Sequence, residues 1–153
     1  MSRTVLLDAG PLGLITNSAR SLQVRAIRGW ADALLAAGHR LIVPAIADYE
    51  VRRELERSEK RAGLARLDAF NSAEPDLYLP LSDTALRLTA TLWARARRQG
   101  MPTADPRALD CDVILAAQAM TIEVPSADLV IATTNVGHLE RFVAALGWES
   151  IRP

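Results

Sequence analysis

Short runs of apolar residues alternate along the chain with segments whose apolar residues recur at helical spacing. The runs are continuously apolar rather than alternating with polar residues, which is typical of strands buried on both faces of a parallel sheet. They predict strands at Thr4–Leu7, Arg40–Pro44, Leu77–Leu81 and Leu129–Thr133, and a last short strand at Trp148–Ile151.

The segments between these runs predict helices. In Leu22–Ala37 the apolar residues repeat every three or four positions, and Gly38 is suited to end the helix. Further helices are predicted from Ala45 to about Lys60, at Leu64–Phe70, from a cap at Ser82 to Gln99, within Leu109–Ala119 and at His138–Leu146. Strands that alternate with helices in this way predict one α/β domain over residues 1–153. We expect a three-layer α/β/α sandwich around a central, mainly parallel sheet of about four or five strands.

Composition narrows the class of protein. Half of the 153 residues are hydrophobic and 24% are charged, the balance of a soluble globular domain. The formal net charge of zero gives no overall basic field, and it does not exclude nucleic acid as a ligand. The single cysteine, Cys111, rules out an internal disulfide and a cysteine-based zinc cluster. No apolar run approaches the ~20 residues of a membrane span, and the first residues are unlike a secretory signal, so we expect a cytoplasmic protein.

Polar side chains follow the predicted strands at the ends that parallel strands share. Asp8 ends the first strand, Asn135 follows the fourth, and the helix after the second strand carries Glu50. Asp110 and Asp112 open an otherwise apolar helix. Because open parallel sheets bind ligands outside the carboxyl ends of their strands, we expect these groups to meet at one edge.

Acidic side chains gathered at one place repel one another. Two carboxylates about 4 Å apart repel by about 4 kcal/mol at an effective dielectric constant of 20. A bound cation removes this repulsion, and oxygen ligands with no Cys or His among them suit Mg²⁺ or Mn²⁺. The sequence therefore predicts a site for a hard divalent cation at this edge of the sheet.

Each of these residues also has an ordinary structural interpretation. Asp8 suits a helix cap or a turn, Glu50 a solvated helix face, and Asn135 a turn. Asp110 suits the N-cap of its helix, which leaves Asp112 in the first turn beside the helix dipole. Residues two apart on a helix are separated by about 200° of rotation, so both aspartates cannot face one ion from regular turns.

Four blocks of sequence, in order and at suitable spacing, resemble the PIN-domain ribonucleases of the VapC-like toxin kind over nearly the full length. They are Leu6-Leu7-Asp8, similar to the opening strand and first acidic ligand; the segment 43–55 around Glu50, similar to the second block; Asp112–Ala117, similar to the metal-binding Asp that leads an apolar helix; and Ala132–Leu139, similar to a Thr-x-Asp/Asn-x-x-His pattern.

The resemblance implies metal-dependent hydrolysis of phosphodiester bonds in single-stranded RNA. It implies that Asp8, Glu50 and Asp112 hold Mg²⁺ or Mn²⁺, and that the ion activates a water and neutralises charge on the phosphate. Asp110 and Asn135 would be auxiliary ligands or water-positioning groups, and Thr133 would orient its loop. Asp112 is the better ligand of the two neighbouring aspartates, whereas Asp110 either caps the helix or bends inward in support.

The chain departs from the family pattern in two places. Ala9-Gly10 stands where Thr or Ser commonly follows the first Asp, and the neutral Asn135 occupies the fourth acidic position, which favours one ion over two. These departures leave open a non-catalytic PIN-like scaffold, and also a binding module whose carboxylates do not meet. A Mg²⁺-dependent phosphatase of the haloacid dehalogenase type is less favoured, because it needs a second Asp at position 10.

The notable basic excess of the chain lies in residues 87–107, which contain five arginines and one acidic residue, Asp105. Its functional interpretation is a phosphate-binding patch that includes Arg97 and Arg98; the alternative is a solvated helix end, where cations are favoured. The resemblance implies an RNA substrate, a small antitoxin protein and a second copy of the chain as partners. The helix at Leu22–Ala37 and the helix after Ala45 offer apolar residues that suit either an antitoxin groove or the core.

Overall fold

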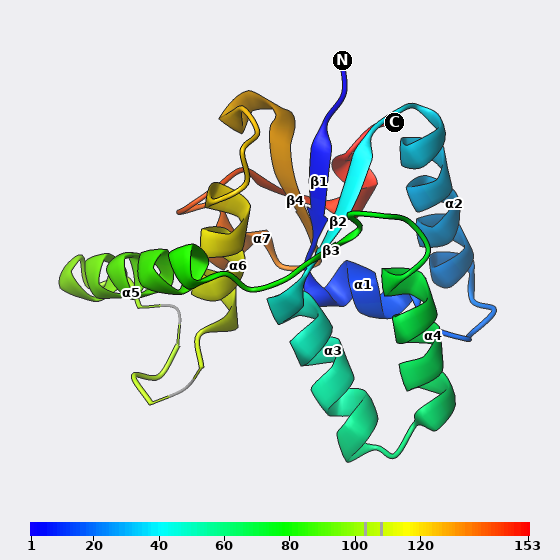
Figure 1. Cartoon of the computed structure of the whole chain (residues 1–153), viewed down its shortest axis with the longest axis horizontal. Helices are drawn as coiled ribbons and strands as arrows, with labels where there is room; N and C mark the ends of the chain where they lie inside the picture. The colour runs from blue at the N-terminus through cyan, green and yellow to red at the C-terminus, as the bar shows by residue number, and fades with distance from the viewer. Residues whose placement is uncertain (103, 108) are drawn as a thin grey trace.

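A parallel sheet runs through the centre of the computed structural model, which describes residues 1–102, 104–107 and 109–153 (Figure 1). The strand order is β3-β2-β1-β4-β5, and all neighbouring strands are parallel. The predicted α/β class is therefore confirmed. The strands are β1 (Thr4–Leu7), β2 (Arg40–Pro44), β3 (Tyr78–Leu79), β4 (Leu129–Thr133) and β5 (Ala145–Gly147).

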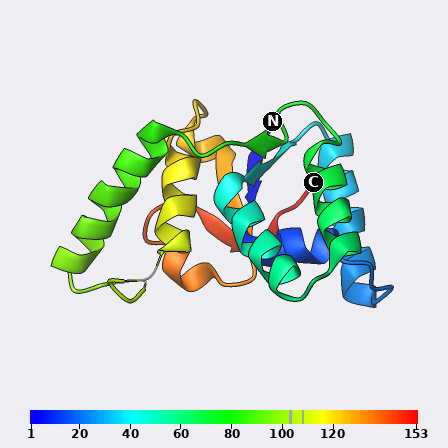
Figure 2. The same cartoon turned by 60° about the horizontal axis from the view of Figure 1, so that its bottom comes forward.

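Helices lie on both sides of the sheet, and α5 lies at the outer side of α6, away from the sheet (Figures 1 and 2). No helix in the described part of the chain is long and apolar enough to cross a membrane. The helices are α1 (Ala9–Ile15), α2 (Leu22–Ala36), α3 (Ala45–Arg57), α4 (Arg61–Asn71), α5 (Asp83–Arg98), α6 (Cys111–Met120) and α7 (Val136–Leu139), with 3₁₀ turns η1 (Ser126–Asp128) and η2 (Trp148–Ser150).

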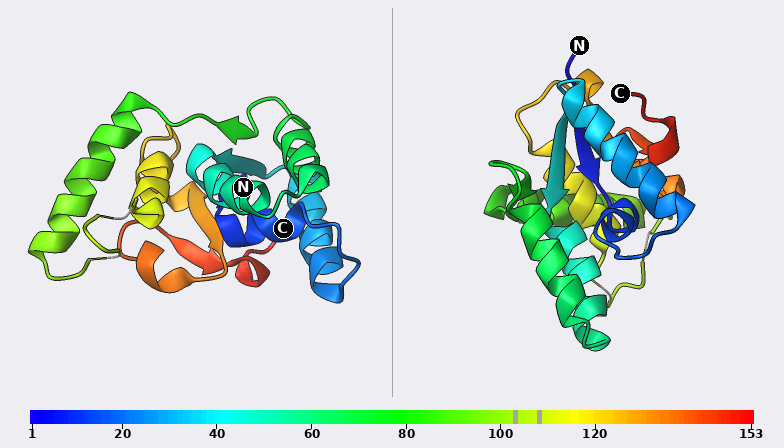
Figure 3. Two further views of the ribbon diagram at one scale, coloured as in Figure 1. Left: turned by 90° about the horizontal axis from the view of Figure 1, so that it is seen from below. Right: turned by 90° about the vertical axis from the view of Figure 1, so that its right-hand side faces the viewer.

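Strand β1 lies in the middle of the sheet, and its side chains pack into a different hydrophobic core on each face. Val5 and Leu7 pack into one cluster with α1 and α2, whereas Leu6 packs into another with α6 and α7. All three side chains are completely buried. The layers are seen edge-on in Figure 3. Helix α5 packs against the outer side of α6 through Leu92 and Val113, so it adds to the three-layer sandwich without covering the sheet.

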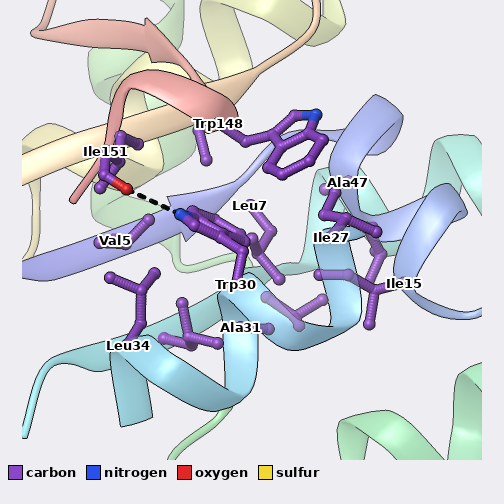
Figure 4. Close-up of a cluster of buried hydrophobic side chains, with 14 of the residues drawn as sticks. Val5, Leu7, Ile15, Ile27, Trp30, Ala31, Leu34, Ala47, Trp148 and Ile151 are labelled. Carbon is purple, nitrogen blue, oxygen red and sulfur yellow. Dashed lines mark hydrogen bonds between the residues drawn. The ribbon is translucent and has the colours of Figure 1, made fainter. Parts of the chain in front are cut away.

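A tryptophan pair holds the C-terminal residues against α2 (Figure 4). The rings of Trp30 and Trp148 meet edge to face, with centroids 5.7 Å apart. The indole N–H of Trp30 donates a buried hydrogen bond of 2.8 Å to the carbonyl oxygen of Ile151. This contact joins residues 121 positions apart and closes one face of the sheet.

The predictions for the last elements are wrong in type. A helix was expected at His138–Leu146 and a strand at Trp148–Ile151, but α7 ends at Leu139, β5 comes next and η2 replaces the predicted strand. Strand β5 pairs with Ile131–Thr133 of β4 and so supplies backbone partners to an edge of that buried strand. Sheet pairing therefore overrides the helical pattern here. The other predicted elements are present, and β3 is the most shortened, with two residues.

Replacing Trp30 by Phe is expected to lower the free energy of unfolding by about 2 kcal/mol, because the buried carbonyl oxygen of Ile151 loses its donor. Urea denaturation measures the change. Trp148→Phe is the matched control, since its buried indole N–H has no partner among the described residues and the same atoms are removed without breaking a bond. Equal losses in the two variants would contradict the role of the Trp30 bond.

Candidate active site

The strand order creates a topological switch point between β1 and β4. The chain leaves β1 for β2 on one side and later returns to β4 on the other side of β1. In open α/β sheets, ligands bind in the crevice at the carboxyl ends of the strands at such a point. Asp8 follows β1 and Thr133 ends β4, and the Thr133 hydroxyl donates a 2.7 Å hydrogen bond to Asp8 Oδ2. This bond joins the two strand ends at the switch point.

Asp8 also begins α1. Its Oδ1 accepts a 2.7 Å hydrogen bond from the backbone N–H of Ala9, so the residue is the N-cap of the helix. Burial raises the pKa of Asp8, the hydrogen bonds from Thr133 and Ala9 lower it, and the negative charge of Asp112 raises it further; the net direction is upward. The side chain is thus fixed in place by two donors but held in a site that disfavours its charge.

Gly10 explains part of the departure from the family pattern. A Cβ atom at this position would lie 2.3 Å from Thr134 Oγ1 and 3.2 Å from Thr134 Cβ. The start of α1 therefore approaches Thr134, in the loop after β4, so closely that a side chain at residue 10 would force Thr134 to shift. The same contact disfavours an aspartate at position 10, which the phosphatase alternative needs. Nothing in the structure explains Ala9 in a comparable way.

Glu50 reaches the same edge from α3. Burial is the largest cause of its raised pKa, followed by the negative charge of Asp8, and the charge of Asp112 adds to the effect. A hydrogen bond from the Cys111 thiol and the nearby guanidinium of Arg53, 3.8 Å away, lower the pKa by less. Three carboxyl groups from separate elements are therefore close enough for their charges to interact.

Asp110 and Asp112 have different surroundings at the start of α6. Asp110 is buried, and its Oδ1 accepts a 3.2 Å hydrogen bond from the N–H of Val113, so it caps the helix. Asp112 lies in the first turn, where its Oδ2 is 3.1 Å from Nδ1 of His138 on α7. Capping, one of the two alternatives expected for Asp110, is what the structure shows; a catalytic role for this residue stays a prediction.

The sequence matches no family model and no curated protein, but its fold matches solved structures. A chain of VapBC2 from Rickettsia felis bound to a promoter DNA fragment superposes with a TM-score of 0.68 at 16% identity, covering 95% of this chain and 98% of that one. VapBC-1 from nontypeable Haemophilus influenzae gives 0.67 at 17%, covering 96% and 99%. FitAcB from Neisseria gonorrhoeae gives 0.64 at 18%, with the same coverage.

The chain has the PIN-domain fold of VapC toxins. The expected resemblance is therefore confirmed at the level of fold, over nearly the whole length of this chain and of the matched chains. At 16–18% identity the likeness extends to the fold alone.

The expectation that no Cys or His lies among the acids is wrong. His138 contacts Asp112, and Cys111 donates to Glu50. Burial and the charge of Glu50 raise the pKa of Cys111 to about 12, so in the metal-free protein the residue is a neutral thiol. His138 belongs to the Thr-x-Asn-x-x-His block, but its contact depends on how α7 packs beside α6, which the sequence pattern does not show.

Asn135 lies beside the cluster without joining it through its side chain. Its backbone N–H donates a 2.9 Å hydrogen bond to Thr133 Oγ1, which helps to hold the loop after β4. The Asn135 side chain is exposed and makes no capping hydrogen bond to α7. The predicted supporting role of Thr133 thus has a structural basis, whereas ligation by Asn135 stays a prediction.

The two arginines predicted to contact RNA lie at the end of α5. The guanidinium of Arg97 lies 4.9 Å from the centroid of the Trp93 ring and donates to the carbonyl oxygen of Ala104, so it holds the loop that follows the helix. Arg98 is exposed. Their contact with RNA stays a prediction.

Within the described residues, no group of three or more His, Cys, Asp or Glu side chains already forms a cluster that could hold a metal ion. The three carboxyl groups instead engage separate partners: Asp8 accepts from Thr133, Glu50 from Cys111, and Asp112 pairs with His138. Any cation that enters must compete with these partners for the carboxylate oxygens.

Glu50→Gln is expected to raise the melting temperature of the metal-free protein at about pH 7 by ~2–4 °C, the effect of ~1 kcal/mol in a chain of this size. The pKa of Glu50 is raised on folding from its ordinary value of 4.5, so the folded state binds the proton more tightly. Its charge therefore destabilises the fold increasingly as pH rises from that value through the folded pKa. The gain should disappear toward about pH 4, as thermal melts in chelator across this range would measure.

Glu54→Gln is the matched control, one turn further along α3. Glu54 is exposed and pairs at 2.8 Å with Arg57, so its neutralisation should change the melting temperature little. A gain for Glu50→Gln that is equal at about pH 4 and pH 7 would contradict an electrostatic origin.

Proposed function

We propose that this protein is an endoribonuclease that hydrolyses phosphodiester bonds of single-stranded RNA with Mg²⁺ or Mn²⁺ as cofactor. The observation that carries the proposal is the meeting of Asp8, Glu50 and Asp112 at the switch point of a PIN-like sheet, with Asp8 and Glu50 both raised in pKa by burial and by neighbouring negative charge. A cation is the ligand that relieves such repulsion, and carboxylate oxygens are ligands that hard divalent cations prefer.

The three acids supply hard oxygen donors of the kind that Mg²⁺ and Mn²⁺ prefer, although the described residues form no ready metal-binding cluster. Asp8, Glu50 and Asp112 would hold the ion, directly or through waters, and Asn135 stands at the end of β4 as an auxiliary oxygen donor. When bound, the ion supplies an activated water and charge neutralisation at the phosphate. The proposed ligands are carboxylate and amide oxygens, which favours Mg²⁺ or Mn²⁺ over a thiophilic metal.

Other residues of the chain position these acids. Thr133 fixes the Asp8 carboxylate through a 2.7 Å hydrogen bond and accepts the N–H of Asn135, so one hydroxyl orders both strand ends. Asp110 caps α6 and thereby fixes the turn that carries Asp112. Such hydrogen-bonded support lets ligands keep their orientation before a cation arrives.

We further propose that the protein is the toxin of a toxin–antitoxin pair, with a small antitoxin and a second copy of itself as partners. Solved structures that share its fold include VapBC and FitAB assemblies, some bound to DNA. An apolar cleft of about 360 Å³ between α2 and α4, lined by Ile15, Leu35 and Phe70, suits a partner helix. It borders α4 rather than α3, the helix expected from the sequence. A small upstream gene with a DNA-binding pattern would support this pairing.

A non-catalytic PIN-like scaffold is the second candidate. It is favoured by the pairing of Asp112 with His138 and by the lack of a ready metal-binding cluster among the described residues. The two candidates differ in whether Mn²⁺ binds to the acids at all.

Asp112→Asn is expected to lower Mn²⁺-dependent cleavage of single-stranded RNA by at least ~100-fold. Loss of a hydrogen-bond partner outside the ligand set already lowers activity by ~10–100-fold, and the loss of a direct ligand should lower it further. It should also weaken the Mn²⁺-induced rise in melting temperature, which reports binding without turnover. Cleavage of a labelled RNA and thermal melts with and without Mn²⁺ measure the two effects.

Asp128→Asn is the matched control. Asp128 lies in η1, before the amino end of β4 and so at the opposite edge of the sheet. Its activity and its response to Mn²⁺ should equal those of the wild type. A wild-type protein that neither binds Mn²⁺ nor cleaves RNA would favour the scaffold.

A further inference from the structure

A cleft of about 710 Å³ opens from the candidate active site and runs between α1, α3 and α4. Helices α3 and α4 extend away from the sheet on the side where α1 lies (Figures 1 and 3). Gly10 and Glu50 line the cleft at the active-site end, and residues from the turn between α3 and α4, including Lys60, line its far end. This α1–α3–α4 cleft is therefore continuous with the carboxyl cluster.

One glycine on the wall of the cleft has no packing explanation. Gly10 and Gly63 lie in close contact with neighbouring side chains, since a Cβ would lie 2.3 Å from Thr134 Oγ1 at Gly10 and 2.7 Å from Leu55 Cδ2 at Gly63. A Cβ at Gly13 would meet only Val51 Cγ2 at 3.9 Å, an ordinary contact. Glycine inside a helix costs about 1 kcal/mol relative to alanine. Because Gly13 has no side chain, the cleft stays wider where this residue lines it.

The charges along the cleft change sign with distance from the site. Glu50 lies at the acidic end, whereas Arg57, Lys60 and Arg66 line the cleft further out. Lys60 is the only lysine of the chain and is exposed. The one further acid on the lining, Glu54, already pairs with Arg57. With Arg57 and Glu54 paired, the remaining basic side chains on the outer lining are Lys60 and Arg66, whose Nε also donates to the carbonyl oxygen of Thr16. A cleft with two such cations that leads to a cation site matches a phosphate backbone better than it matches an apolar peptide.

We propose that the α1–α3–α4 cleft binds the single-stranded RNA on one side of the phosphate that is cleaved. Lys60 and Arg66 contact phosphates of the strand, and the missing side chain at Gly13 leaves room for it. The inference rests on the proposed ribonuclease function and deepens it by naming the path of the substrate. An extended peptide from a protein partner is the competing occupant.

Gly13→Leu tests the width of the cleft. In an Asp112→Asn host, which prevents cleavage, it should weaken binding of a fluorescein-labelled single-stranded RNA at least about tenfold, measured by fluorescence anisotropy. Gly29→Leu is the matched control: Gly29 lies inside α2, and a Cβ there would have nothing within 4 Å. Both substitutions improve helix propensity, so melting temperatures should not fall and a folding defect is separated from a binding defect.

Lys60→Ala tests the phosphate contact. It should reduce the slope of log affinity against log salt by ~0.7, the value for one phosphate contact on a single strand. Arg25→Ala, an exposed arginine on α2, should leave the slope unchanged. Because the chain has a single lysine, its acetylation can be followed by mass spectrometry, and RNA should slow it.

The outcomes separate the two proposals. A wild type that cleaves RNA, together with Gly13→Leu and Lys60→Ala variants that bind RNA as the host does, would overturn the cleft assignment alone. If the Gly13→Leu and Lys60→Ala variants lose binding to the product of an adjacent small gene but still bind RNA, the cleft assignment is also overturned, in favour of a peptide. A wild type that neither cleaves nor binds RNA would overturn the ribonuclease function and the cleft together.

Discussion

Strand β1 is buried on both faces and paired in parallel on both edges, and the rest of the structure depends on this constraint. Its side chains need a helix layer on each face, and its parallel neighbours need crossover connections, so the carboxyl ends of the strands all meet at one edge. Because β2 and β4 lie on opposite sides of β1, the chain diverges there, and Asp8 is the first residue beyond the strand.

A buried glutamine fixes the relative positions of the helices that bring the other two acids to the carboxyl ends of the strands. Gln118 of α6 is only 1% exposed, and its side-chain oxygen accepts a 3.1 Å hydrogen bond from the N–H of Ile46 at the start of α3. Its amide nitrogen donates to the carbonyl oxygens of Leu79, the last residue of β3, and of Pro80, which follows it. A buried amide with all these bonds satisfied locks α3 to α6, and these are the helices that carry Glu50 and Asp112.

The unfavourable electrostatic energy of the fold is concentrated at the carboxyl ends of the strands, where the acidic side chains are buried close together. Each carboxyl group has a partner, Thr133 for Asp8, Cys111 for Glu50 and His138 for Asp112. These partners only partly offset burial for Asp8 and Glu50, whose pKa values remain raised. Local preferences that are broken in a well-packed chain tend to gather at functional sites. The helix glycine at position 13, on a cleft that opens from the same acids, is a second case of this kind.

The sequence by itself determined the α/β class, the first strands and the helices beside them, because buried parallel strands and amphipathic helices have local patterns. It also brought Asp8, Glu50 and Asp112 into one hypothesis, since strand ends and helix starts are visible locally. Only tertiary structure decided that residues 145–147 form β5, because an edge of β4 needs a backbone partner. Only packing placed His138 and Cys111 against the acids and opened the cleft at Gly13, because these contacts join residues whose spacing along the chain carries no periodic signal.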